Sequence, residues 1–145
     1  MPVFWTVSHS TRLVVTSVKG VASLEDMKGC VAAIMTPATL SYRKLVDLSE
    51  GQLALSREDF LTLDEYVRKH SGIGPRGALA ITVGSDDGER QAQLFASLSV
   101  ADRPLKIFRE PQAARAWLDT QPSCAFAPWL MEAASMMREE APPPE

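Results

Sequence analysis

The start of the chain holds two short runs of β-branched, aromatic and other apolar residues, which predict a pair of strands. The runs are Phe4 to Ser8 and Leu13 to Lys19, separated by residues 9–12. Two such runs so close together are typical of an antiparallel hairpin. Gly20 is predicted to end the second strand.

A helical spacing of apolar residues follows the hairpin. Ser23 can cap the first turn through its hydroxyl group, and Glu25 and Asp26 suit the positive end of the helix dipole. Pro37 is predicted to stop this helix, and Cys30 is interpreted as a small buried hydrophobe beside the apolar stripe. The stripe consists of Leu24, Met27, Val31 and Ile34.

The next strand and helix form a second unit. Residues Tyr42 to Leu48 predict a strand, with Gly51 in the turn that follows it. Ser56 then caps a helix that runs to about Lys69, with Asp59 in the return position of a capping box. The predicted inner face of this helix comprises Phe60, Leu63 and Val67. The ion pairs predicted on its solvated face are Asp64–Arg68 and Glu65–Lys69.

Two further strands and two helices complete the pattern. Residues Ala78 to Val83 are apolar on both faces apart from Thr82, which is typical of a central strand. A helix is predicted over Asp86–Leu98 and a last strand over Leu105–Phe108. Pro111 then occupies the first position of a final helix.

This order of elements predicts an α/β fold with helices packed on a mixed β-sheet. The N-terminal hairpin is antiparallel, and the remaining strands are parallel because helical crossovers join them. The domain is predicted over residues 1–121. Residues 122–145 are predicted to form an extension, with an amphipathic helix over 128–138 and a disordered proline-rich tail. The candidate residues for a contact between subunits, or for packing on the chain's own domain, are Trp129, Leu130 and Met137.

Composition and charge narrow the classes of partner. The chain has 145 residues and a net charge of −3, as expected for one ordinary globular domain. No basic run interleaves with aromatic residues, which argues against a nucleic-acid partner. There is no long apolar window and no signal-peptide pattern, and the two cysteines lie far apart. The sequence therefore predicts no integral membrane segment and a cytoplasmic location.

No catalytic constellation stands out along the chain. Nucleophilic catalysis needs a serine or cysteine beside a base, and the only histidines are His9 and His70. Ser8 and Ser10 flank His9, but neighbours on a strand point to opposite sides. No local spacing assembles four zinc ligands. We therefore expect no enzyme activity, no metal and no cofactor. The alternative is an enzyme whose site is assembled from residues that are distant in sequence, such as Cys30 and His70.

Two glycine-containing segments invite a phosphate-binding interpretation. Residues 72–77 precede a strand and lack the ending of a P-loop, so they are interpreted as a connecting loop. Residues 84–88 do lie between a strand and a helix. However, Asp86 and Asp87 would repel phosphate, and their spacing is not that of a calcium loop. A capped helix start is the interpretation that we favour there.

Polar residues after the third predicted strand are the main binding candidates. Asp47 lies near the carboxyl end of that strand, where ligands of open α/β sheets tend to bind. Ser49 and Ser56 are close in sequence and are predicted to share the same rim, with Arg57 beside Ser56. The alternative is that Asp47 only accepts backbone hydrogen bonds in the turn.

Taken together, these segments resemble the SpoIIAA-like proteins of bacteria, which are also described as STAS/SEC14-type domains. STAS domains are shared by sulfate transporters and anti-sigma-factor antagonists. The resemblance covers roughly residues 3–120. It rests on the hairpin, the segment Leu45-Val46-Asp47-Leu48-Ser49, the capped helix from Ser56, and the closing segment Ile107–Leu118. It implies a mixed sheet covered by helices and a regulatory or binding role.

The chain departs from the phosphorylation motif of that family. In true antagonists the corresponding helix starts at an Asp-Ser-Ser-Gly segment, whose serine is phosphorylated by a partner kinase that is also the anti-sigma factor. Here the stretch is Leu55-Ser56-Arg57-Glu58, without the aspartate and the glycine. Phosphate on Ser56 would meet a helix N-terminus and Arg57, but Glu58 and Asp59 would oppose it. The usual phosphoserine motif is therefore absent.

Two functions follow from this interpretation. The first is a non-enzymatic regulatory or protein-interaction module that acts through the rim near Asp47 and Ser56, on a protein partner or as a homodimer. The alternative is a carrier of a small apolar or lipid-like ligand, as the SEC14 likeness implies. A carrier needs a roomy apolar pocket between the sheet and its helices.

Overall fold

The computed structural model describes residues 2–71, 76–98 and 103–121. The helix expected over 128–138 and its interface candidates Trp129, Leu130 and Met137 lie outside the described residues, as does most of the glycine loop at 72–77. Within the described ranges the order of elements is β-β-α-β-α-β-α-β-α, as the sequence predicts.

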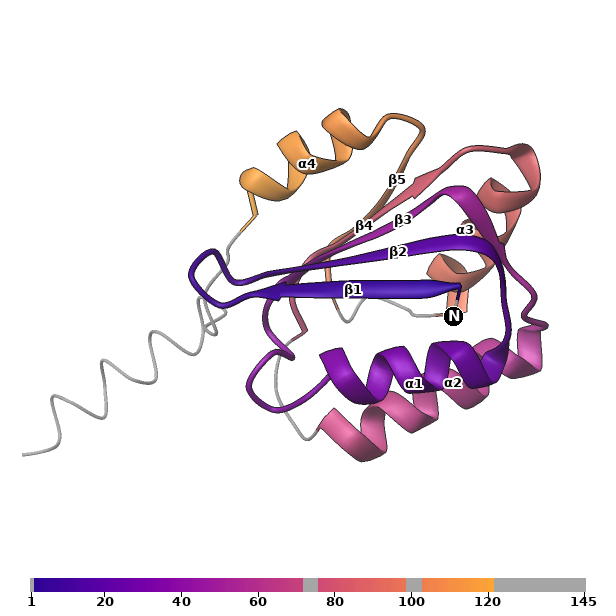
Figure 1. The fold of residues 1–145 in the computed structure, drawn as a ribbon, viewed down its shortest axis with the longest axis horizontal. Coiled ribbons are helices and arrows are strands. Elements are labelled where there is room, and N and C mark those ends of the chain that lie inside the picture. The colour runs from indigo at the N-terminus through magenta and orange to yellow at the C-terminus, as the bar shows by residue number, and fades with distance from the viewer. Residues whose placement is uncertain (1, 72–75, 99–102, 122–145) are drawn as a thin grey trace, which may run out of the picture.

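In the part of the chain that the structure describes, one five-stranded mixed sheet forms the centre (Figure 1). Its strands are β1 (Val3–Ser8), β2 (Leu13–Ala22), β3 (Arg43–Leu53), β4 (Leu79–Val83) and β5 (Leu105–Phe108), and they lie side by side in chain order. The pair β1–β2 is antiparallel and the other three pairs are parallel. The predicted fold class is confirmed.

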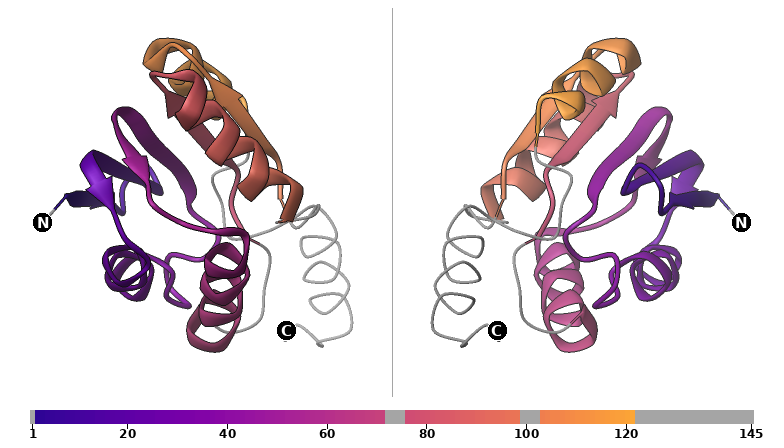
Figure 2. Two further views of the ribbon diagram at one scale, coloured as in Figure 1. Left: turned by 90° about the vertical axis from the view of Figure 1, so that its right-hand side faces the viewer. Right: turned by 90° about the vertical axis from the view of Figure 1, so that its left-hand side faces the viewer.

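In the described ranges, four helices cover the two faces of the sheet unequally. They are α1 (Leu24–Ile34), α2 (Arg57–Ser71), α3 (Asp86–Leu98) and α4 (Pro111–Asp119). Each parallel strand is added on the same side of the last, so right-handed crossovers place α1, α2 and α3 on one face. Helix α4 follows the last strand and lies on the other face, and the turned views show α1 and α2 side by side (Figures 1 and 2).

The two faces of the sheet carry two separate cores. The smaller core lies under α4 and contains Leu45, Ala80 and Leu118. The larger core lies between the sheet and the three-helix layer, where Val14, Phe60 and other apolar side chains are nearly inaccessible to solvent. Cys30 belongs to this larger core, as the sequence predicts.

Two glycines that were expected to end strands lie inside them. Strand β2 continues past Gly20 to Ala22, and β3 continues past Gly51 to Leu53, because Gly20 and Gly51 pair with each other across the two strands. A Cβ atom on Gly51 would overlap the Val18 carbonyl group. Gly51 therefore permits close approach of the two strands, whereas Gly20 adopts a positive φ of 89° that favours glycine. The strand end predicted at Gly20 and the turn predicted at Gly51 are wrong.

Helix starts follow their predicted caps. The Ser23 hydroxyl accepts a hydrogen bond from the Asp26 backbone N–H, and the Asp26 carboxylate accepts one from the Ser23 backbone N–H. Ser56 and Asp59 exchange the same pair of hydrogen bonds at the start of α2, with N–O distances of 3.0 and 3.1 Å. Both capping boxes satisfy backbone N–H groups that a helix start otherwise leaves without partners.

Candidate functional site

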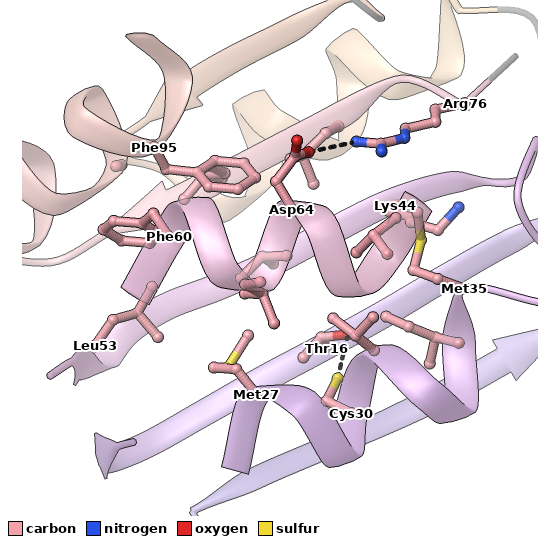
Figure 3. A pocket seen from close by; sticks show the side chains of 18 of the residues that line it. Thr16, Met27, Cys30, Met35, Lys44, Leu53, Phe60, Asp64, Arg76 and Phe95 are labelled. Atoms are coloured by element: carbon pink, nitrogen blue, oxygen red, sulfur yellow. Dashed lines mark hydrogen bonds and ion pairs between the residues drawn. The ribbon is translucent and has the colours of Figure 1, made fainter. Parts of the chain in front are cut away.

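A cavity of about 100 Å³ lies between the sheet and the layer of α1, α2 and α3 (Figure 3). We call it the helix–sheet cavity. Apolar side chains form most of its described lining, including Met27 and Val31 of α1, Leu63 of α2, Ile81 of β4 and Ala92 of α3. The lining residues on strands point to one face of the sheet because alternate side chains of a strand share a face.

Aromatic rings and a thiol shape the apolar part of the cavity. The rings of Phe60 and Phe95 bring α2 and α3 together, with their centroids 5.7 Å apart (Figure 3). Cys30 faces Thr16, with 3.9 Å between Sγ and Oγ1. Burial raises the pKa of the Cys30 thiol to about 11, against a weaker opposing effect of the Thr16 hydroxyl. The thiol is therefore protonated at neutral pH and contributes to the apolar wall.

A buried lysine marks one end of the helix–sheet cavity. Lys44 on β3 is only 3% exposed. Its Nζ donates hydrogen bonds to the backbone oxygens of Thr39, Leu40 and Tyr42 at 2.9, 3.0 and 2.9 Å. Among the described residues, no carboxylate forms an ion pair with it. Three carbonyl acceptors match the three N–H donors of an ammonium group.

Burial is the main influence on the titration of this lysine. It lowers the pKa of Lys44 to about 7, with smaller contributions from the positive charges of Arg103 and Arg76. Both arginines also belong to the cavity lining. The two forms of Lys44 are therefore both populated near neutral pH.

Asp64 of α2 joins this charged end to the helix layer. One of its oxygens lies 3.2 Å from Arg76 Nη1 and the other lies 2.8 Å from Arg68 Nε. Burial raises the pKa of Asp64, but the hydrogen bonds and charges of Arg68 and Arg76 outweigh it, so the pKa lies below its usual range. The sequence places Asp64 on a solvated helix face. The structure corrects this, because its side chain is 21% exposed and lines the cavity.

Sequence reasoning missed Lys44, Arg76 and Arg103. One signal for Lys44 was available, since Lys44, Val46 and Leu48 alternate on the face of β3 that packs against the three helices. A lysine at a core-facing position of a strand is unusual unless its charge is satisfied. The two arginines follow connecting segments, where spacing carries no signal about the direction of a side chain.

The structure separates the residues that the sequence places on one rim. Asp47 Oδ1 accepts a hydrogen bond from the Ser49 backbone N–H at 2.9 Å, which is the structural alternative predicted for it. Strand β3 then continues to Leu53, six residues beyond Asp47 and roughly 20 Å of extended chain. Ser56 and Arg57 therefore lie at a distance from Asp47 and Ser49, and all but Asp47 are exposed.

Ser49 instead borders a shallow hollow at the carboxyl ends of β3 and β4. The hollow measures about 350 Å³, and its described lining includes three glycines and two serines, among them Gly84 and Ser85. Ser85 Oγ accepts a hydrogen bond from the Gly88 N–H at 3.0 Å. This contact fits the capped helix start proposed for residues 84–88.

The hairpin turn does not pair its serines with its histidine. Ser8 Oγ accepts a hydrogen bond from Thr11 Oγ1 at 2.7 Å, and Ser10 Oγ lies 3.4 Å from Ser8 Oγ. His9 Nδ1 instead lies 2.9 Å from the Tyr42 hydroxyl oxygen. Within the described ranges, no group of three or more His, Cys, Asp or Glu side chains is placed to hold a metal ion.

Comparison with known proteins identifies the fold. No protein-family model matches the chain, and no curated protein matches it. A crystal structure of an uncharacterized protein from the DUF3478 family of Shewanella loihica PV-4, described as SpoIIAA-like in fold, superposes with a TM-score of 0.50. The two share 20% sequence identity over 80% of this chain and 93% of that chain.

The chain has a SpoIIAA-like fold. This agrees with the resemblance of the sequence, and it concerns the architecture alone at this level of identity. None of the helices in the described ranges combines the length and apolar character that crossing a bilayer requires.

Proposed function

We propose that this SpoIIAA-like domain is a non-enzymatic binding module whose ligand site is the helix–sheet cavity. The observation that carries this proposal is a mainly apolar cavity that ends at the buried Lys44. Protein cores are close-packed, with few voids larger than a water molecule. Burying a charge costs stability unless it is satisfied. A cavity that combines both features is better explained as a ligand site than as part of an ordinary close-packed core.

The size of the cavity favours a small ligand. A dry apolar cavity of about 150 Å³ accepts benzene, whereas pockets for drug-sized ligands measure about 300–1,000 Å³. At about 100 Å³, the helix–sheet cavity suits a chain of about four carbon atoms. A whole lipid of the kind that a SEC14-type carrier holds is too large for it. The proposal therefore keeps the small apolar ligand predicted from the sequence and sets aside the lipid-like one.

The chemistry of the lining supports binding rather than catalysis. The Cys30 thiol, with its pKa raised to about 11, is a poor nucleophile at neutral pH. The Lys44 ammonium group donates its three N–H groups to backbone carbonyls, which leaves it no lone pair to act as a nucleophile. No histidine is among the described lining residues to serve either group as a base.

A titration followed by methyl NMR tests this proposal. We expect butan-1-ol, which has a four-carbon chain and no charge, to shift the methyl signals of Ile34 and Leu63, which line the cavity. The methyl signals of Val7 and Val21 on the hairpin should stay in place, since these residues are not part of the described lining.

A matched pair of variants on α3 completes this test. Ala92→Leu places a larger side chain in the cavity and should abolish the shifts, because Ala92 is a lining residue. Ala96→Leu is the control, since Ala96 is half-buried on the same helix but is not among the described lining residues. Unchanged Ile34 and Leu63 signals in the folded wild-type protein would refute the proposal.

Partner binding at the start of α2 is the second candidate function. Ser56 and Arg57 are exposed there, which supports a contact surface of the regulatory kind that the sequence favours. Ser56→Asp should then change which proteins are recovered with this chain in a pull-down, with Ser23→Asp as a control at another capped helix. An unchanged set of partners would exclude this surface.

A further inference from the structure

We propose that the ligand of the helix–sheet cavity carries one anionic group, in its simplest form a carboxylate, on a short apolar chain. The anionic group would lie at the end of the cavity near Lys44, Arg76 and Arg103, with the chain among the apolar side chains. This inference rests on the proposed function and adds the chemical class of the ligand.

Charge is distributed unevenly along the cavity. Among the described lining residues, the cations are Lys44, Arg76 and Arg103, and the one carboxylate is Asp64. Lys44 and Arg76 lie toward the same end in Figure 3, and Arg103 is close enough to Lys44 to influence its protonation. Asp64 offsets one of these positive charges through its contact with Arg76. Cationic side chains therefore outnumber carboxylates in the described lining, and a low-dielectric surrounding strengthens their attraction for an anion.

The two kinds of cation contribute differently. Lys44 directs its Nζ hydrogens at the Thr39, Leu40 and Tyr42 oxygens, so it holds a positive charge in place. A guanidinium group has five N–H donors in a planar fork that matches a carboxylate, and it can serve one beside an existing partner. We therefore assign the direct contact with the anionic group to Arg76 and Arg103, and electrostatic support to Lys44.

Asp64 also makes a cationic ligand a poor fit. Its carboxylate already contacts Arg68 and Arg76, with N–O distances of 2.8 and 3.2 Å. A ligand ammonium at this end would compete with both arginines for Asp64 and would face Lys44 at close range. An anion avoids this competition.

The test compares two ligands of nearly the same shape. Pentanoate and pentanamide have the same four-carbon tail, and only pentanoate is charged. Calorimetric titrations at pH 6 keep Lys44 protonated, because its pKa is about 7. We expect pentanoate to bind about tenfold more tightly than pentanamide, since hydrogen bonds to charged groups are the stronger ones.

Charge-removing variants locate the anionic group. Arg103→Gln should lower the affinity for pentanoate to the level of pentanamide and leave the affinity for pentanamide unchanged. Lys106→Gln removes one positive charge from an exposed position on β5 outside the described lining, so it should change neither affinity. If Arg103→Gln does not fold, as judged by its circular dichroism, Arg76→Gln takes its place with the same expectation.

The outcomes distinguish this inference from the proposed function. Equal affinities for pentanoate and pentanamide, both lost in Ala92→Leu, would overturn the anionic ligand and leave the binding cavity standing. A pentanoate affinity that Arg103→Gln and Arg76→Gln leave intact would also overturn it. The absence of binding by either ligand would overturn both.

Discussion

Lys44 shares the core-facing side of β3 with Val46 and Leu48, where an apolar side chain is expected. Its neighbours across the sheet are Val14 on β2 and Leu79 on β4, and both are buried. A lysine in such surroundings is tolerated because three backbone oxygens accept its hydrogen bonds. Even so, burial lowers its pKa to about 7, so its charge costs folding free energy. At the scale of the residue, this cost is the clearest sign that the position serves binding.

The lowered pKa of Lys44 predicts how stability depends on pH. The unfolded chain keeps the ordinary lysine pKa of 10.5, so above pH 7 it binds more protons than the folded protein does. The free energy of unfolding should therefore rise by up to about 1.4 kcal/mol per pH unit. This window runs from about pH 7 to 9, because above pH 9 the Cys30 thiol, whose pKa is raised from 9.0 to about 11, contributes an opposite dependence on pH that offsets the rise.

Urea denaturation at pH 6, 7, 8 and 9 measures this dependence. The variant Lys44→Met keeps the apolar part of the side chain and lacks the titrating group, so its stability should rise much less over the same range. Equal pH slopes in the wild-type protein and in Lys44→Met would show that Lys44 does not titrate as described.

Ser56 provides a second prediction at the residue scale. Its hydroxyl accepts the Asp59 N–H at the start of α2, so Ser56→Ala should lower the free energy of unfolding by about 1 kcal/mol. Ser56→Asp should be nearly neutral, because aspartate is an equally good N-cap. Thermal unfolding of both variants checks this. If Ser56→Ala is as stable as Ser56→Asp, the cap does not contribute as proposed.

At the scale of the element, local signals account for most of the fold. Ser23, Ser56 and Pro111 mark helix starts correctly, and the final strand at Leu105–Phe108 has its predicted bounds. The predictions at Gly20 and Gly51 are wrong because the sequence does not distinguish a glycine in a turn from one inside a strand, where Gly20 has a positive φ and Gly51 lies against the Val18 carbonyl group. Which of the two applies depends on the partner strand, and the pairing of β2 with β3 is a non-local fact.

The candidate site was less predictable than the fold for the same reason. The sequence points to Asp47 and Ser56, which are near in the chain, but the six further residues of β3 separate them. Lys44 lies on β3, Asp64 lies on α2, and Arg76 lies three residues before the start of β4. Only the packing of α2 on the sheet brings them together. Spacing along the chain cannot reveal such a group.

The close approach of β2 and β3 gives the prediction at this scale. Gly51→Ala should destabilise the protein strongly, by an amount in the range of about 1–3 kcal/mol, because the added methyl group overlaps the Val18 carbonyl. Gly29→Ala is the matched control, since the added methyl group meets open space on an exposed face of α1. It should stabilise the helix by about 0.5–1 kcal/mol. Chemical denaturation measures both changes, and equal effects would contradict this account of β2 and β3.

At the scale of the whole molecule, the order of strands decides where a site can form. The strands follow chain order from β1 to β5, so the sheet has no point where the order reverses and opens a crevice at the carboxyl edge. The space lies instead between the sheet and the three helices on one face, with the contact of Phe60 and Phe95 among its lining residues and Lys44 at the charged end. The binding site that we propose is thus a consequence of the topology.

Native mass spectrometry of the full chain tests the central claim most directly. The protein and its Ala92→Leu variant would be incubated with the small-molecule filtrate of a bacterial extract, desalted, and measured at low collision energy and again after denaturation. We expect a fixed extra mass on the wild-type protein that is released as a small anion on denaturation, and its absence from the folded Ala92→Leu variant. A wild-type protein that carries no added mass, or the same mass as Ala92→Leu, would contradict the claim that the helix–sheet cavity is a ligand site.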